Sequence, residues 1–343
     1  MNRRLFILLL ALVLTLPAGS LTVKMGSLLP DGSPWDQALH ELSARWHKLS
    51  DGEITLKIYP GGITGDEPDM LRKLRIGQLQ AAVMTGAGLA QIDPGLLVLQ
   101  LPLLIADDRE LSCLLENLRP VLTARLEERG YVPVLWTVAG WAHFFSRRPV
   151  SSPEELQKQR LHMPPGNPRE TAILKKAGFQ VVPLPINDVL MALQSGLVEA
   201  FIGSPLTAAV MQWFGSARYM CALRWAPLIG AVVVSRETWR QIPPPLQPRL
   251  LQAAAEVEEL LQTRTNRLEE KALQVMLDNG LVIRPVPAAA RSEWEALAES
   301  GTEQLVGRHL PAELYAEVLH LLETIRAEAG TPDTGSAQTS PAE

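Results

Sequence analysis

The chain has few of the residues that build metal centres and disulfide frameworks. Its 343 residues include two cysteines, and its six histidines are scattered along the sequence. They form no HExxH run and no paired Cys/His spacing of the kind that binds zinc. The sequence therefore predicts neither a metal ion nor a cofactor. Cys113 and Cys221 lie far apart, so we expect two free thiols, with a disulfide as the alternative in an oxidising compartment.

Neither sign of charge dominates, and only one long hydrophobic run is present. The 32 Lys and Arg residues are interspersed with 37 Asp and Glu residues. Because they form no basic stripe, the charge pattern argues against a nucleic-acid partner. The hydrophobic run is Leu5–Leu16, which follows Arg3-Arg4 and precedes the small residues Ala18-Gly19-Ser20.

This N-terminal pattern is typical of a signal peptide. The apolar run is too short to span a bilayer comfortably, and the small residues after it offer a cleavage site. We expect residues 1–20 to be removed near Ser20 and the mature chain to lie in the periplasm. An uncleaved membrane anchor is the alternative.

The most informative feature that is present is an internal repeat. Leu190–Ser204 aligns with Leu71–Thr85 at a constant offset of 119 residues. Both segments have the pattern of a short helix, a glycine at its end (Gly77 or Gly196) and a strand that ends in a hydroxyl side chain. A single repeat of this kind predicts two similar α/β lobes rather than a solenoid. Open α/β sheets bind ligands beyond the carboxyl ends of their strands, so the two strand ends are expected to face a shared crevice.

The order of predicted helices and strands divides the chain into two lobes. Residues 246–279 contain no glycine and no proline after Pro248, which predicts one helix far longer than the usual length of about a dozen residues. Residues 331–343 contain no large apolar side chain and are expected to be disordered. The predicted domains are a signal peptide (1–20), lobe I (21–138 plus 226–250), lobe II (139–225 plus 280–328), the long bracing helix (246–279) and the disordered tail (331–343).

Two glycine-containing stretches partly match enzyme motifs. Gly86-Ala87-Gly88 follows a predicted strand, but the third glycine of a dinucleotide fingerprint is missing and Pro94 follows soon after. Gly203-Ser204-Pro205 lacks the glycine spacing of a nucleophile elbow. We expect the first stretch to be a turn at the edge of the crevice and neither stretch to be catalytic.

The aromatic residues point more clearly to a site. Eight Trp residues stand against four Tyr and six Phe. Trp35, Trp141, Trp213 and Trp225 all lie at the starts of predicted elements or where the chain crosses between lobes. For any one tryptophan, packing in the core is the alternative. Four in such places together predict a pocket with aromatic walls.

Four segments, in their order along the chain, carry a family resemblance. They are PGGITGDEPDMLRKLRIGQLQAAVMT at 60–85, GWAHFFSRRPV at 140–150, the stretch 156–205, and VVVSRETWRQIP at 232–243. In these segments the chain resembles the substrate-binding P subunits of tripartite ATP-independent periplasmic (TRAP) transporters, over roughly residues 21–328. The resemblance implies an α/β, two-lobe periplasmic binding protein (type II-like) with a long helix that braces both lobes. Such a protein closes over a ligand and docks on a membrane permease.

The resemblance also implies where the ligand binds, and there the chain departs from the family. His162 occupies the place of the family's carboxylate-binding arginine, Arg160 lies two residues earlier, and Ser204 replaces the usual asparagine. A neutral histidine cannot reproduce the two-pronged, permanently charged contact of arginine, so we expect an apolar or amphipathic small molecule as ligand. A displaced acid-binding arginine, Arg160 or Arg169, is the alternative. The predicted ligand-binding residues are Trp35, Glu67, Thr85, Trp141, Phe144, His162, Ser204, Leu206, Trp213, Trp225 and Leu228.

The favoured function is therefore an extracytoplasmic solute receptor that delivers its ligand to a TRAP-type membrane permease without chemistry of its own. A subgroup of such receptors works beside a periplasmic helical-repeat lipoprotein, which is a further candidate partner. One alternative is a periplasmic enzyme that uses His162 as a base, with Glu67 or Asp66 as its carboxylate partner. Another is a sensor or interaction module built on the same scaffold.

Overall fold

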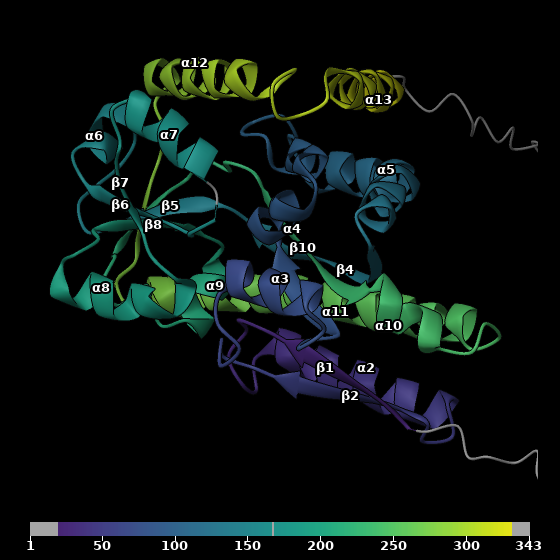
Figure 1. Cartoon of the computed structure of the whole chain (residues 1–343). Coiled ribbons are helices and arrows are strands. Elements are labelled where there is room, and N and C mark those ends of the chain that lie inside the picture. Colours follow the sequence, from purple (N-terminus) through teal and green to yellow (C-terminus); the bar gives the residue numbers. More distant parts are fainter. Residues whose placement is uncertain (1–19, 167, 331–343) are drawn as a thin grey trace, which may run out of the picture.

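The computed structural model describes residues 20–166 and 168–330. The predicted disordered tail and the predicted signal peptide, apart from Ser20, lie outside the described residues. The described chain forms two α/β lobes, and the long helix α11 (Gln247–Asp278) runs along both of them (Figure 1). The predicted two-lobe α/β class is confirmed.

Lobe I is built on a five-stranded sheet with helices on both faces. Its strands β1, β2 and β3 run parallel, whereas β10 is antiparallel to both of its neighbours. Alternating residues of the three strands β3, β10 and β4 enter two separate cores, as Val83 and Met84 do. The strand order is β2 (Ile54–Tyr59), β1 (Leu21–Gly26), β3 (Ala81–Thr85), β10 (Pro227–Ser235) and β4 (Tyr131–Trp141).

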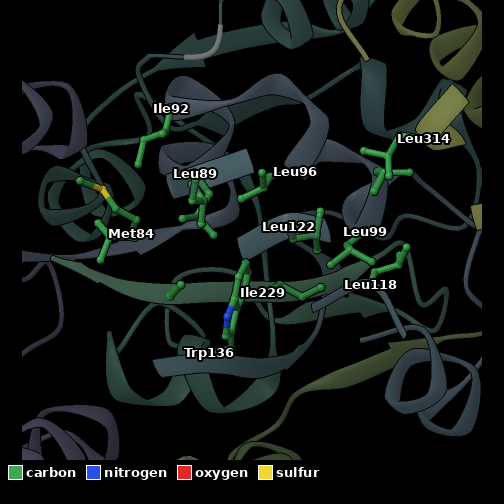
Figure 2. Packing of buried hydrophobic residues seen from close by; sticks show 14 of the residues in the cluster. Met84, Leu89, Ile92, Leu96, Leu99, Leu118, Leu122, Trp136, Ile229 and Leu314 are labelled. Atoms are coloured by element: carbon green, nitrogen blue, oxygen red, sulfur yellow. The ribbon is translucent and has the colours of Figure 1, made fainter. Parts of the chain in front are cut away.

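The two faces of this sheet are covered by different helices. One face carries α2 (Pro34–Leu49), α10 (Arg236–Gln241) and the first half of α11. The other face carries α3 (Glu67–Arg75), α4 (Gly86–Ile92), the 3-10 turn η1 (Pro94–Gln100) and α5 (Asp108–Glu128). On that second face, Leu89 and Leu118 pack in one core with Trp136 of β4 and Ile229 of β10 (Figure 2).

Lobe II has a second sheet, of six short strands. Its aromatic core stacks Phe145 on Phe201 with ring centroids 4.9 Å apart. One face is covered by α6 (Pro153–Gln157), α7 (Pro168–Lys176) and α12 (Ala288–Leu305), and the other by η2 (Ile186–Asp188), α8 (Val189–Ser195), α9 (Pro205–Val210) and the end of α11. The strand order is β11 (Val282–Arg284), β9 (Tyr219–Cys221), β5 (His143–Ser146), β8 (Ala200–Gly203), β6 (Arg160–Met163) and β7 (Gln180–Pro183).

The sequence repeat corresponds to a repeated piece of structure. Gly77 and Gly196 both adopt positive φ angles, 71° and 78°, where a glycine ends the helix at low cost. Thr85 then accepts a hydrogen bond from the backbone N–H of Gly88 and caps α4, and Ser204 caps α9 in the same manner. The hydroxyl residues of the repeat are therefore helix caps at the ends of equivalent strands.

Helix α11 spans about 48 Å at 1.5 Å per residue. Leu250, Val257 and Leu261 pack in the core of lobe I, whereas Met276 belongs to the core of lobe II. The predicted bracing helix is thus confirmed. Among the described residues, no helix has both the length and the apolar character needed to cross a bilayer.

The last helix lies elsewhere than expected. The sequence-based domains assigned 280–328 to lobe II, and α12 does pack there, against α6 and α7. Helix α13 (Ala312–Gly330) instead packs against α5 of lobe I, where Val318 and Leu322 are buried. The ion pair from Arg326 Nε to Glu110 Oε1, at 2.7 Å, joins the same two helices. The physical reason is that α13 buries its apolar face on α5, which is distant in the sequence.

The two cysteines lie in different lobes. Cys113 is on α5 and Cys221 is on β9, and both are free thiols.

Candidate ligand-binding cavity

A cavity of about 370 Å³ lies between the lobes. It is bounded by the ends of β3, β4 and β10 in lobe I and of β6 and β8 in lobe II, as expected for paired α/β lobes. Two of the chain crossings between the lobes, from β4 to β5 and from β9 to β10, form one wall. They are hydrogen-bonded to each other, because Ala142 N–H donates to Ala226 O and Trp225 N–H donates to Ala142 O, both at 2.8 Å.

The wall of the cavity is predominantly apolar. Its polar side chains, apart from the tryptophan indoles, are Thr85, Gln100, Thr137, His162, Glu170 and Thr207. No lysine or arginine lines the cavity in the described part of the chain. A ligand here therefore meets large apolar surfaces and a few hydrogen-bonding groups, with no permanent positive charge.

An aromatic cluster forms the lobe II side of the wall. Phe144 stacks on Trp294 with ring centroids 4.9 Å apart, and Trp225 packs against both rings at 5.2 and 5.5 Å. Trp294 Nε1 donates to Ser151 O, which fixes the indole. Trp294 is a lining residue that the sequence reasoning missed, because α12 lies outside the repeat and only its single tryptophan could have pointed to the cavity.

His162 lies at the cavity-facing end of β6 and is only 3% exposed. Its Nε2 is 2.9 Å from Leu184 O, and a carbonyl can only accept, so Nε2 carries the proton. Burial lowers the pKa of His162 to about 4. The ring is thus uncharged at neutral pH, and it packs edge-on against Trp213.

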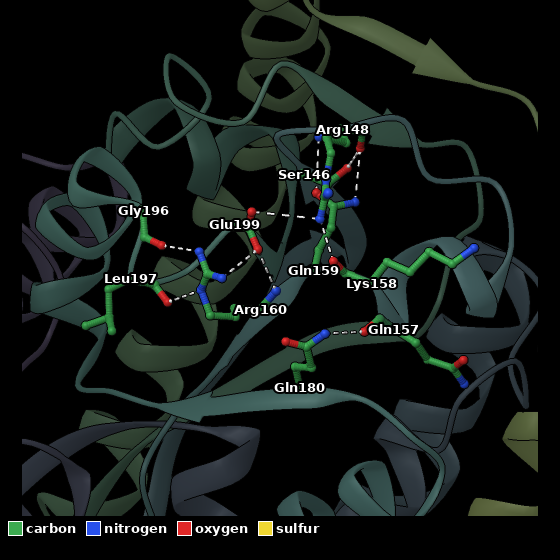
Figure 3. Close-up of polar contacts among 10 residues, drawn as sticks. All are labelled: Ser146, Arg148, Gln157, Lys158, Gln159, Arg160, Gln180, Gly196, Leu197 and Glu199. Atoms are coloured by element: carbon green, nitrogen blue, oxygen red, sulfur yellow. Dashed lines mark hydrogen bonds and ion pairs between the residues drawn. The ribbon is translucent and has the colours of Figure 1, made fainter.

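The two arginines that could have replaced the family's clamp do not reach the cavity. Arg160, at the far end of β6, donates to Leu197 O at 3.0 Å and to Gly196 O, and it pairs with Glu199 at 3.3 Å (Figure 3). Arg169 is exposed on α7 and does not line the cavity. Neither guanidinium is placed to bind an acid between the lobes.

Glu67 supports the cavity from behind. Its carboxyl group is 3% exposed and accepts the N–H of Thr85 at 2.6 Å and the hydroxyl of Thr85 at 2.9 Å. Burial raises the pKa of Glu67 to about 7. Thr85 lines the cavity and Glu67 does not. His162 bonds Leu184 O, Glu67 bonds Thr85, and the Asp66 side chain caps α3. Neither carboxyl group therefore forms the pair with His162 that the enzyme alternative requires.

The structure brings most of the predicted ligand-binding residues to the cavity wall, but not all of them. Trp141 is buried and donates from Nε1 to Asp108 Oδ1 at 2.8 Å. Ser204 caps α9, and Leu206 is buried with its N–H donated to Glu269 Oε2 at 2.8 Å. The predicted residues that line the cavity are Trp35, Thr85, Phe144, His162, Trp213, Trp225 and Leu228.

The lobes also touch directly through a hydrogen bond outside the cavity wall. Asn187 Nδ2 in lobe II donates to Gly61 O in lobe I at 3.0 Å. Gly62, with a φ angle of 72°, lies so close that an added Cβ would be 2.0 Å from Asn187 Nδ2. A side chain at residue 62 would therefore have to displace the end of the Asn187 side chain and adopt an unfavourable positive φ angle.

Comparison with known proteins places the chain in one protein family. The family model for bacterial extracellular solute-binding proteins, family 7, matches residues 25–307. The C4-dicarboxylate-binding periplasmic protein DctP of Rhodobacter capsulatus is 22% identical over 317 residues, which cover 90% of this chain and 94% of that protein. The sialic acid-binding periplasmic protein SiaP of Vibrio cholerae is 23% identical over 64% of this chain and 69% of its own length.

Solved structures share the fold. A sugar acid binding protein from Advenella mimigardefordensis, in complex with galactonate, superposes with a TM-score of 0.81 at 18% identity, covering 90% of this chain and 99% of that one. A TRAP periplasmic solute binding protein from Sulfurospirillum deleyianum, with bound succinate, gives a TM-score of 0.79 at 19% identity, covering 88% and 99% of the two chains.

Proposed function

We propose that this chain, which belongs to family 7 of the bacterial extracellular solute-binding proteins and is a substrate-binding subunit of the TRAP type, carries an uncharged apolar or amphipathic small molecule. The ligand lies between the lobes and is handed to a TRAP-type membrane permease. No bond is made or broken in this role, which is that of a receptor and not of an enzyme.

The observation that carries this proposal is the cavity wall. In the described residues it contains aromatic and aliphatic side chains and no lysine or arginine. A carboxylate moved from water into such a wall would lose its hydration without gaining a counter-charge, at an effective cost of several kcal/mol. An apolar group in the same place is stabilised by about 25 cal/mol per Å² removed from water.

The names of several relatives point to acids instead, and the proposal departs from them at one position. Relatives are named for C4-dicarboxylates and sialic acid, and solved relatives hold galactonate or succinate. In this chain the family's arginine position is His162, which burial keeps neutral. At about 20% identity, ligand chemistry depends on such single positions rather than on the shared fold.

The direct experiment is to identify the solute that the protein carries. The protein is purified from its native periplasm without denaturation, and the released ligand is identified by mass spectrometry. We expect an uncharged molecule with a large apolar part. Recovery of a carboxylic acid at one equivalent per chain would refute the proposal and favour the acid-receptor alternative.

Binding by this fold is expected to involve closure of the lobes. The hinges are Val138–Gly140 and Ala222–Pro227, where the chain crosses between them. Gly140 supports this assignment with a φ angle of 92°. The carboxyl group of Glu269 on α11 lies 2.8 Å from where a Cβ of residue 140 would be. The long helix therefore contacts the hinge itself.

Two finer points complete the proposal. The receptor is exported, with cleavage near Ser20, and it works beside a periplasmic helical-repeat lipoprotein in addition to the permease. Co-purification of both partners with a tagged receptor from its native membrane fraction tests this assembly. Recovery of the permease alone would remove the lipoprotein from the proposal.

A further inference from the structure

We infer that one arm of the cavity, between α2, β4 and α11, binds an uncharged hydrogen-bond acceptor on the ligand through Trp35 Nε1 and Thr137 Oγ1. This inference rests on the proposed function and deepens it, since it specifies the chemistry of the ligand's polar end: a carbonyl, hydroxyl or ether oxygen on an otherwise apolar molecule.

Trp35 supplies the first of the two polar atoms. Ser33 caps α2 by accepting the backbone N–H of Asp36, and this places Trp35 in the first turn of the helix, at the cavity. Its side chain is 5% exposed, and no described residue accepts a hydrogen bond from its buried Nε1. A buried indole N–H ordinarily has an acceptor, so this atom indicates a partner that is not part of the chain.

Thr137 supplies the second atom, from the sheet. It stands in register with Gly230 on β10, which in turn pairs with Thr85 on β3. A Cβ at residue 230 would lie 2.8 Å from Met84 O and 3.4 Å from Thr137 Cγ2, so the close packing of the strands beside Thr137 requires a glycine. Thr137 Oγ1 is buried, and the described part of the chain offers it no hydrogen-bond partner.

The two atoms belong to the same arm of the cavity. Trp35, Leu135 and Leu261 lie in one hydrophobic core and all line the cavity, from α2, β4 and α11 respectively. Thr137 lies two residues after Leu135 on the strand and therefore points to the same face. Both unpartnered polar atoms thus face the side of the sheet that α2 and α11 cover.

The donor pattern defines the ligand group. An indole N–H can only donate, whereas a threonine hydroxyl can donate or accept. No charged side chain of lobe I lines the cavity in the described residues. An ammonium group would oppose the Trp35 N–H, and a carboxylate would lack a counter-charge here. An uncharged oxygen satisfies both protein atoms without either penalty.

The test measures binding of three probes of equal chain length: 2-octanone, 1-octanol and octanoate. Calorimetry is used, since Trp35→Phe would disturb a fluorescence signal. The substitutions Trp35→Phe and Thr137→Val each remove one polar atom and keep most of the side chain. Each is expected to weaken 2-octanone and 1-octanol about tenfold, the value of one well-placed hydrogen bond.

Two matched controls, Thr265 and Trp239, do not line the cavity. Thr265 on α11 is 1% exposed, and its Oγ1 also lacks a partner among the described residues. Thr265→Val therefore repeats the chemistry of Thr137→Val away from the ligand. Trp239, which packs on Trp46, gives the control Trp239→Phe. Both controls should bind the probes within about twofold of the wild type.

Thermal unfolding without probe separates a ligand contact from a structural role. Removing an unpaired buried hydroxyl should leave the Tm of Thr137→Val equal to or above that of the wild type. Loss of Tm together with binding would make Thr137 structural and overturn its part in the inference.

The remaining outcomes distinguish the polar contact at Trp35 and Thr137 from the proposed function. If the wild type binds the neutral probes and both cavity variants bind them as well as the controls do, the polar arm is refuted and the proposed function stands. If octanoate binds more tightly than the neutral probes, the proposed function itself fails. Absence of binding by all three probes counts against both.

Discussion

Replacing His162 by arginine introduces the residue that the family resemblance implies at this position, in a cavity whose wall is predominantly apolar. His162 is nearly fully buried, it donates from Nε2 to Leu184 O, and its ring lies edge-on to Trp213. A guanidinium in this place would carry a permanent charge into a wall that contains no other cation in the described chain.

The expected loss of ligand affinity in His162→Arg follows from the cost of desolvating the guanidinium. The effective penalty for burying an ion in a protein interior is several kcal/mol when no counter-ion compensates it. An uncharged ligand offers no such compensation, so its affinity should fall at least about a hundredfold, or about 2.7 kcal/mol. An acid would gain, because arginine binds carboxylates through two parallel hydrogen bonds.

The assay is calorimetric titration of the native ligand, 2-octanone and octanoate into wild type and His162→Arg. Glu170 is an acidic side chain of the cavity wall, so the variant is also measured in a Glu170→Gln background to remove a local counter-charge. Arg160→Ala and Arg169→Ala serve as controls and should keep the native ligand within about tenfold, or 1.4 kcal/mol.

Two results would refute this reasoning. If His162→Arg retains the native ligand at wild-type affinity, the cavity tolerates charge and its apolar wall does not select the ligand. If either alanine variant loses binding a hundredfold while its Tm is unchanged, the acid-binding arginine has only moved, and the ligand is an acid.

Three further predictions concern stability, closure and export. Burial raises the pKa of Glu67 from 4.5 to about 7, so stability that is present below pH 4.5 is lost as the pH rises through 7. Glu67→Gln should therefore reduce the fall in free energy of unfolding between pH 4 and pH 8 by about 3 kcal/mol in denaturant titrations, and an unchanged pH profile would contradict the assignment. Gly62→Ala should displace the Asn187 side chain from Gly61 O, so that ligand reduces the radius of gyration in small-angle scattering less than in the wild type. Equal compaction in both would mean that Gly62 does not control closure, and no compaction of the wild type at saturation would mean a preformed cavity. N-terminal sequencing of periplasmic protein should start near Leu21, and Met1 would instead indicate an uncleaved anchor.

The sequence by itself determined the architecture, because its signals are local. The repeat between 71–85 and 190–204 became two equivalent helix–strand units, since a glycine that ends a helix and a hydroxyl that caps the next one act within a few residues. The long uninterrupted helical pattern became α11 for the same reason. The family resemblance followed from the order of the four segments at 60–85, 140–150, 156–205 and 232–243.

The sequence could predict a cavity residue only where that residue lies at a crossing between the lobes or at the end of a strand. Trp225 and Phe144 lie at the crossings between lobes, and Thr85 and His162 lie at strand ends, so topology alone brings them to the cavity. Trp141 lies at a crossing too, but its indole bonds Asp108 behind the wall. The position in the sequence does not determine whether such a side chain faces the cavity or the core behind it.

Only the tertiary structure decided the charge of the cavity. Arg160 and His162 share one face of β6, yet they stand about 7 Å apart along the strand, and only the second is at the cavity. The nearby carbonyl groups of Gly196 and Leu197, together with Glu199, bind the guanidinium at the other end. Likewise, α13 joined lobe I because its apolar face matches α5. Long-range packing selects one partner surface among several that local sequence leaves equivalent, and here it leaves Arg160 and Arg169 away from the cavity.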